Sequence, residues 1–230
     1  SLYSTNVYFL PIREVVFYNV DAISGDLRWA RLKVIKEILD DKNKKIIVTS
    51  IDALTSLYTP KEYYLRDSMI IKTGDDIDLK EISKSLLQCG YERVEVVEGK
   101  GEFSFRGGIL DVFPPTSAYP YRVELFGDEV DSIRTFNTES QRSIEKVEEF
   151  SIFPSKEVIV DDECRSRAVQ NINEELKKVI ANVSKENKES VEKIKGIVGK
   201  NIELLNNTYY FETIDSYLPF FYEKLDSFFD

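Results

Sequence analysis

The run from Val158 to Glu163 contains the residues of this chain that come nearest to a catalytic motif. Three apolar residues precede Asp161, Asp162 and Glu163, the order in which nucleotide hydrolases place carboxylates that hold magnesium and polarise water. Such a site also needs a phosphate-binding loop of the form Gly-x-x-x-x-Gly-Lys-Ser/Thr, and the sequence contains none. We therefore predict that Asp161 or Asp162 caps the following helix, with Glu163 at its positive end.

Other catalytic chemistry is restricted by the residue types themselves. The 230 residues include no histidine, which excludes Ser-His and Cys-His nucleophile pairs, imidazole metal sites and an imidazole base. Cys89 and Cys164 are too few and too far apart for a disulfide framework or a zinc knuckle, so we expect inert packing residues in a reducing, cytoplasmic setting. We expect no catalytic residue, no metal and no bound cofactor in this chain.

The segment Tyr121–Phe126 offers a binding surface instead. Strand alternation places Arg122, Glu124 and Phe126 on one face, and the earlier strand 102–106 presents Arg106 in the same way. Arginine beside an exposed aromatic ring is the composition of a binding hot spot. The alternative is that Phe126 packs under a neighbouring helix while both arginines pair with nearby carboxylates. The residue pattern leaves both interpretations open.

Composition indicates the kind of molecule that carries these residues. With 42% apolar and 31% charged residues, the chain can form one to three globular domains, and no apolar run is long enough to span a membrane. The net charge of −10 repels phosphate, which disfavours a protein built to coat nucleic acid and favours protein partners. Residues 75–154 hold 17 acidic and 9 basic side chains, which suggests a separate module.

The elements that position these residues follow from apolar periodicity and from capping residues. Helical spacing predicts helices over 26–39, from the cap Asp78 to the stop Gly90, beyond Val160 as far as Val183, and over 190–205. A brief helix capped by Ser50 or Asp52 should end before Pro60. The predicted strands share β-branched or alternating apolar residues and cover 45–49, 69–71, 93–98, 102–106, 109–113, 121–126, 129–136 and 150–153. An α/β fold follows.

One long stretch resembles a known family. Residues 101–143 read GEFSFRGGILDVFPPTSAYPYRVELFGDEVDSIRTFNTESQRS and closely resemble the signature shared by the bacterial excision-repair protein UvrB and the transcription-repair coupling factors, the Mfd family. Gln141-Arg142-Ser143, Phe153-Pro154 and the segment 214–221 are similar to the coupling-factor pattern. The resemblance covers essentially the whole chain and implies the amino-terminal UvrB-homology module of a longer protein.

The resemblance also implies a domain organisation. Residues 1–74 would form an α/β domain like UvrB domain 1A, 75–154 a small α/β UvrA-binding domain with a mainly antiparallel sheet, and 155–230 a segment like UvrB domain 1B. The flanking domains would be degenerate descendants of the P-loop NTPase fold. The fragment itself would not be an enzyme, because the ATP- and magnesium-dependent DNA translocase of the full-length family lies in other domains.

The function implied by the resemblance is recruitment of UvrA to a lesion-stalled RNA polymerase in transcription-coupled nucleotide excision repair. The family's contact residues correspond to Arg106, Arg122 and Phe126, with Glu124 as a further contact. RNA polymerase and DNA would bind other domains, and a carboxy-terminal domain would contact the same face. The alternative function is a UvrB-type nucleotide-dependent DNA remodeller in which Asp162 and Glu163 hold magnesium.

Overall fold

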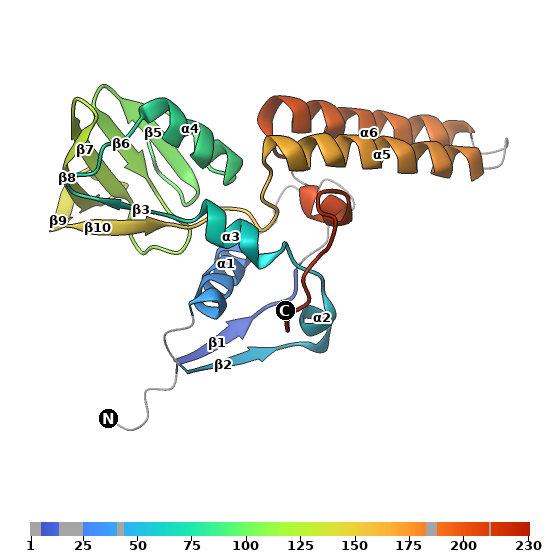
Figure 1. Cartoon of the computed structure of the whole chain (residues 1–230), viewed down its shortest axis with the longest axis horizontal. Helices are drawn as coiled ribbons and strands as arrows, with labels where there is room; N and C mark the ends of the chain where they lie inside the picture. Colours follow the sequence, from blue (N-terminus) through green and yellow to red (C-terminus); the bar gives the residue numbers. More distant parts are fainter. Residues whose placement is uncertain (1–5, 14–24, 41–43, 183–187, 212) are drawn as a thin grey trace.

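A six-stranded sheet forms the largest layer of the computed structural model, which describes residues 6–13, 25–40, 44–182, 188–211 and 213–230 (Figure 1). Its order is β4-β5-β6-β7-β8-β9, antiparallel except for the parallel pair β4–β5. The strands are β4 (Glu92–Arg93), β5 (Glu102–Arg106), β6 (Ile109–Val112), β7 (Tyr121–Phe126), β8 (Glu129–Phe136) and β9 (Ser143–Val147).

One face of this sheet is covered by helix α4 (Leu79–Gln88) and by the antiparallel pair β3 (Met69–Lys72) and β10 (Glu149–Ile152). Ile82 and Leu86 of α4 pack in one buried cluster with apolar residues of the sheet, such as Phe103 and Val123. The opposite face carries polar side chains such as Asp111 and Arg122, beside the small apolar cluster of Val97, Phe113 and Phe136. The sheet is therefore a two-layer unit with one free polar face.

Local signals fix the ends of α4. The carboxylate of Asp78 accepts hydrogen bonds from the amides of Lys80 and Glu81, which caps the first turn. At the other end Gly90 adopts a φ of 82°, and its amide donates to the Leu87 carbonyl. Glycine suits this position because it reaches the left-handed region without steric cost. Both predicted boundaries are confirmed.

The first part of the chain forms a parallel βαβ unit. Strands β1 (Asn6–Leu10) and β2 (Lys45–Thr49) pair in parallel, and helix α1 (Gly25–Leu39) lies against them. Short helices α2 (Ile51–Thr55) and α3 (Lys61–Asp67) follow. The outer face of the two strands is apolar and open to solvent, with exposed fractions between 49% and 63% for Val7, Phe9, Ile46 and Val48.

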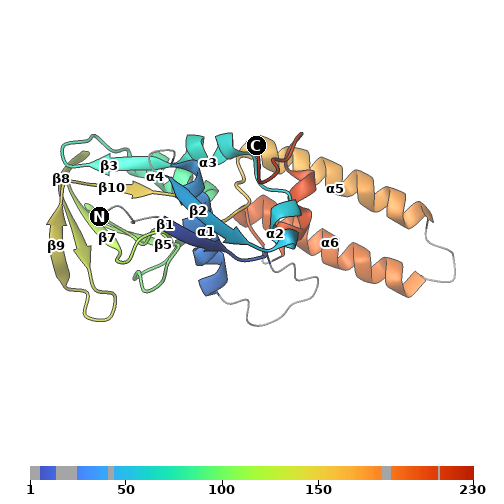
Figure 2. The same ribbon diagram turned by 90° about the horizontal axis from the view of Figure 1, so that it is seen from below.

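The last part of the chain is dominated by two long helices. Helices α5 (Asp162–Asn182) and α6 (Lys188–Thr208) run side by side and project away from the rest of the molecule in both views (Figures 1 and 2). The 3₁₀ helix η2 (Ile214–Phe220) packs beneath them. The carboxy-terminal aromatic residues supply core contacts here, since Phe211, Phe221 and Tyr222 are buried with Ala168 and Ile172 of α5.

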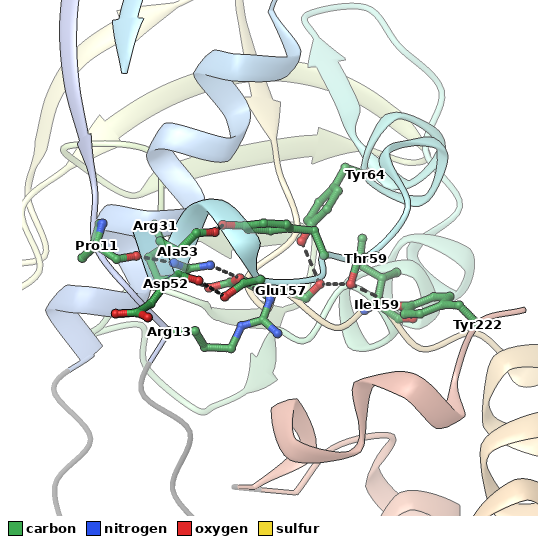
Figure 3. Close-up of polar contacts among 12 residues, drawn as sticks. Pro11, Arg13, Arg31, Asp52, Ala53, Thr59, Tyr64, Glu157, Ile159 and Tyr222 are labelled. Atoms are coloured by element: carbon green, nitrogen blue, oxygen red, sulfur yellow. Dashed lines mark hydrogen bonds and ion pairs between the residues drawn. The ribbon is translucent and has the colours of Figure 1, made fainter. Parts of the chain in front are cut away.

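A buried carboxylate connects the first part of the chain to the segment that precedes α5 (Figure 3). Glu157 accepts hydrogen bonds from Arg31 of α1 at 2.5 and 2.9 Å and from Arg13 at 2.7 Å. Its backbone carbonyl accepts the hydroxyls of Thr59 at 2.5 Å and Tyr64 at 2.8 Å. Burial would raise the pKa of Glu157, but the two guanidinium groups outweigh it and lower that pKa to about 2.

Several sequence predictions differ from the structure. The predicted strand 93–98 ends at Arg93, because Val97 leaves the sheet edge and is buried against Phe113 and Phe136. Strands β1 and β9 and helix α3 were not predicted from the sequence. Val183, predicted to continue the stripe of α5, lies outside the described residues.

Candidate functional site

The free polar face of the sheet is organised around one buried carboxylate. Asp111 in β6 lies directly opposite Arg122 in β7 in the strand register, and its side chain is only 1% exposed. Arg122 donates from Nε to Asp111 Oδ1 at 2.7 Å and from Nη2 to Oδ2 at 2.8 Å. This is a two-point ion pair in which the planar guanidinium matches the carboxylate.

The other edge of the Arg122 guanidinium is also held. Its Nη2 donates to the side-chain oxygen of Gln141 at 3.1 Å and its Nη1 to the Gln141 carbonyl at 3.3 Å. The ring of Phe136 lies 4.4 Å from Cζ, within range for a cation–π contact. The hydrogen bonds with Asp111 raise the pKa of Arg122, so its charge is fixed across the accessible pH range.

Arg106 reaches the same carboxylate from the end of β5. Its Nη2 lies 3.3 Å from Asp111 Oδ2, while half of its side chain is exposed to solvent. The β5–β6 hairpin turns immediately afterwards at Gly107, whose φ of 62° favours glycine. Arg106 is thus tethered at one point and accessible along the remainder of its guanidinium.

Glu124 lies two residues further along β7, on the same face as Arg122. Ser132 of β8 donates its hydroxyl to Glu124 Oε2 at 2.9 Å, and the Nη2 of Arg134 lies 3.5 Å from the same oxygen. The Glu124 side chain is 35% exposed, so it remains available at the surface. The polar face therefore alternates basic and acidic groups across β6, β7 and β8.

Phe126 ends β7 with its ring in solvent. The residue is 84% exposed, the largest exposed fraction among the large hydrophobic residues that the structure describes as exposed. It precedes the turn at Gly127, where φ is 67°. The amide of Leu125 donates to the Gly108 carbonyl at 2.7 Å, so the ends of the β5–β6 and β7–β8 hairpins lie side by side. Arg106 and Phe126 therefore belong to neighbouring hairpin ends.

The contacts agree with the face that strand alternation predicts for Arg122, Glu124 and Phe126. The alternative interpretation is right for the two arginines and wrong for Phe126. Both Arg106 and Arg122 pair with a carboxylate, but Phe126 does not pack under a helix. The sequence reasoning missed Asp111, the carboxylate that both arginines share. The sequence did offer a signal, because Asp111 is the lone charge between the apolar residues Leu110 and Val112 of a predicted strand.

The second candidate site is a helix cap. Asp161 Oδ1 accepts the amide of Cys164 at 2.7 Å, and Asp161 Oδ2 lies 3.0 Å from Arg66. Asp162 pairs with Lys84 and Arg165. These contacts confirm capping by Asp161.

Remaining groups that could carry chemistry are buried or dispersed. Burial raises the pKa of the Cys89 thiol to about 12 and that of Cys164 to about 11, which disfavours the reactive thiolate. Within the described ranges, histidine, cysteine and carboxylate side chains form no group of three suited to a metal ion. None of the described helices combines the length and apolar character that crossing a membrane requires.

Comparison with known proteins places this sheet within a family. Residues 69–158 match the family described as the UvrB interaction domain. The chain is 34% identical over 225 residues to the transcription-repair-coupling factor of Bacillus subtilis (strain 168), covering 98% of this chain and 19% of that protein. The corresponding protein of Staphylococcus aureus (strain USA300) is 31% identical over 204 residues, 89% of this chain and 17% of its own length.

A third relative, the transcription-repair-coupling factor of Staphylococcus haemolyticus (strain JCSC1435), is 34% identical over 173 residues, 75% of this chain and 14% of its own length. The class defined by the sheet and its family match is a protein with a UvrB interaction domain. More particularly, the chain belongs to the transcription-repair-coupling factor family. It spans about a fifth of the length of the curated relatives it matches.

Proposed function

We propose that this chain is a protein-interaction module that recruits UvrA to an RNA polymerase stalled at a lesion in transcription-coupled nucleotide excision repair. The observation that carries the proposal is the exposed Phe126 ring beside Arg106 and Arg122 on the free face of the UvrB interaction domain. Covering an exposed aromatic ring with a partner favours binding, because it removes apolar surface from water.

The proposed contact residues for UvrA are Arg106, Arg122 and Phe126, with Glu124 alongside. Aromatic and arginine side chains dominate the energetics of protein interfaces, and they do so most where their geometry is fixed beforehand. Arg122 is fixed by Asp111 and Gln141, and Phe126 stands on a tight hairpin. These features support a docking role for this face.

The domain division and the ancestry of the flanking parts belong to the same proposal. Residues 75–154 would be the UvrA-binding domain, with 1–74 and 155–230 derived from the 1A and 1B domains of a P-loop NTPase fold. The parallel β1–α1–β2 unit supports a nucleotide-fold origin for the first part. ATP-driven translocation, contacts with RNA polymerase and DNA, and a carboxy-terminal domain that covers this face would belong to other parts of a longer cytoplasmic protein.

A binding titration with purified UvrA tests the proposal. Phe126→Ala and Arg122→Ala should each weaken binding by about 2 kcal/mol or more, roughly 30-fold, because each removes a central anchor. The matched control is Phe229→Ala, which truncates a similarly exposed aromatic residue (78%, against 84% for Phe126) outside the matched domain and should bind within about twofold of the parent. Circular dichroism confirms that each variant is folded.

The outcomes separate the parts of the proposal. A folded parent chain that does not bind UvrA would contradict the recruiting function. Normal binding by both Phe126→Ala and Arg122→Ala would leave the function standing and overturn the assignment of this face.

A further inference from the structure

The buried carboxylate of Asp111 lies beneath the polar face and is not among the proposed contact residues. Asp111 is the one acidic group that contacts both Arg106 and Arg122 within the described residues, and it is screened from solvent by the groups that it binds. We infer that Asp111 is a positioning residue of the docking face, which holds the two arginines in the arrangement that UvrA meets. This inference rests on the proposed function.

Counting donors shows how the two arginines differ. A guanidinium has five N–H groups. Arg122 directs four hydrogen bonds to Asp111 and Gln141, from Nε, Nη1 and twice from Nη2. Arg106 makes a single contact, at 3.3 Å, within the described part of the chain. Arg122 is therefore a rigid part of the surface, while Arg106 keeps most of its donors for a partner.

The location of Asp111 in the fold explains why it can position both groups. Its backbone is fixed between β5 and β7 by the central register of the sheet, opposite Ser104 on one side and Arg122 on the other. Both of its oxygens accept from Arg122 of β7, and Oδ2 also accepts from Arg106 of β5. One rigid carboxylate thus sets the spacing between arginines that are 16 residues apart in sequence.

Because Asp111 fixes the arginines before UvrA binds, it should lower the entropy cost of binding. A free arginine loses rotamer freedom when a partner immobilises it, and a prefixed arginine has already lost it on folding. Removing the Asp111 charge while keeping its shape should therefore weaken UvrA binding even though Asp111 itself does not reach the partner. Asp111→Asn makes that change, because asparagine is nearly isosteric and keeps one acceptor oxygen, while an NH2 donor replaces the other.

The first experiment is a double-mutant cycle on UvrA binding. Asp111→Asn should weaken binding at least tenfold in the parent chain and less than threefold in an Arg122→Ala background, because most of the group through which it acts is already absent. The matched control is Glu81→Gln on α4, at the opposite face of the sheet, which changes the net charge equally. It should bind within about twofold of the parent.

The second measurement begins with the parent chain, so its first result needs no variant of Asp111. Nitrogen-15 relaxation should find the Nε–H group of Arg122 as rigid as the sheet backbone, whereas that of the exposed Arg142 should be mobile. In Asp111→Asn the Arg122 signal should lose this rigidity while backbone amides elsewhere in the sheet keep their positions. A merely structural role would move the backbone signals as well.

Each outcome decides one question. A parent chain that fails to bind UvrA contradicts the proposed function, while relaxation still tests the positioning. Binding by the parent with binding within twofold by Asp111→Asn overturns the inference and leaves the function intact. An equal loss in both backgrounds, or an Arg122 Nε–H group that is mobile in the parent, also overturns it. If Asp111→Asn does not fold, the relaxation data on the parent decide alone.

Discussion

Asp161 occupies the residue before α5, where a carboxylate accepts a free amide of the first turn and lies beside the guanidinium of Arg66. The apolar run before it gives the appearance of a magnesium-binding motif. Asp162 and Glu163 instead form ion pairs within α5, with Arg165 and Arg167 respectively. The hydrogen-bond and ion-pair partners of these carboxylates therefore distinguish a helix cap from a magnesium site.

The cap gives a direct prediction for stability. Asp161→Ala should lower the free energy of unfolding by about 1 kcal/mol, because the Cys164 amide loses its acceptor and the helix end loses a favourable charge. Urea denaturation at neutral pH measures the change. Glu174→Ala, an exposed position within the same helix, is the control and should change stability by less than about 0.5 kcal/mol. Equal effects of the two substitutions would contradict the capping role.

Among the elements, the end of α4 depends on a residue without a side chain. Gly90 has a φ of 82°, and an added Cβ would collide with the Lys156 side chain and lie 3.2 Å from Tyr210 Cζ. Gly74, between β3 and α4, has a similar φ of 88° but open space around it. Substitutions at the two glycines therefore distinguish the cost of the backbone conformation from the cost of a steric clash.

Alanine at these two positions should have different costs. Gly74→Ala should destabilise the chain by about 1–2 kcal/mol, the cost of the left-handed conformation for an L-residue. Gly90→Ala should cost clearly more, because Lys156 and Tyr210 must also move. Urea midpoints of the two variants and the parent measure the difference. Equal destabilisation would mean that the contacts around Gly90 yield freely.

Elements with a strong local pattern were predictable from sequence, and the missing ones show why others were not. β8 is rich in β-branched and aromatic residues over Glu129–Phe136, whereas β9 is an exposed edge strand whose only apolar residues are Ile144 and Val147. Helix α3 begins after Pro60, which reads as a breaker, and is stabilised by the buried Tyr64, a contact distant in sequence. Tertiary contacts decided these elements.

The same distinction applies to the candidate site. Alternation within β7 was enough to place Arg122, Glu124 and Phe126 on one face, because the period of a strand is a property of its backbone. The pairing of Arg122 with Asp111 required the register between β6 and β7, which the connection over 113–120 determines. Alternation within one strand does not reveal that register, because it depends on how the two strands and their connection pack together.

At the scale of the whole molecule, Glu157 connects α1, the segment before α3 and the residues that precede α5 (Figure 3). Glu157→Gln should destabilise the chain by roughly 3–5 kcal/mol, because two buried guanidinium groups lose their counter-charge. Urea unfolding at pH 7 measures the loss. Glu163→Gln, at an exposed ion pair, should cost less than about 1 kcal/mol.

The stabilisation by Glu157 has a defined pH dependence. Its pKa is about 2 in the folded chain against an ordinary value of 4.5, so folding favours the ionised form. The stabilisation is complete above about pH 4.5 and is lost as pH falls towards 2. The difference in unfolding free energy between the parent and Glu157→Gln should therefore shrink over that interval. A difference that stays constant across it would contradict the ion-pair account.

The open apolar face of β1 and β2 governs how the isolated chain behaves in solution. Parallel strands are ordinarily covered on both faces, and this pair leaves Val7, Phe9, Ile46 and Val48 in water. The folded chain should therefore bind the dye anilinonaphthalene sulfonate and scatter more light per molecule as its concentration rises. Ile46→Thr with Val48→Thr should reduce both signals without loss of strand content. Binding of UvrA should therefore be measured at low concentrations of the isolated chain.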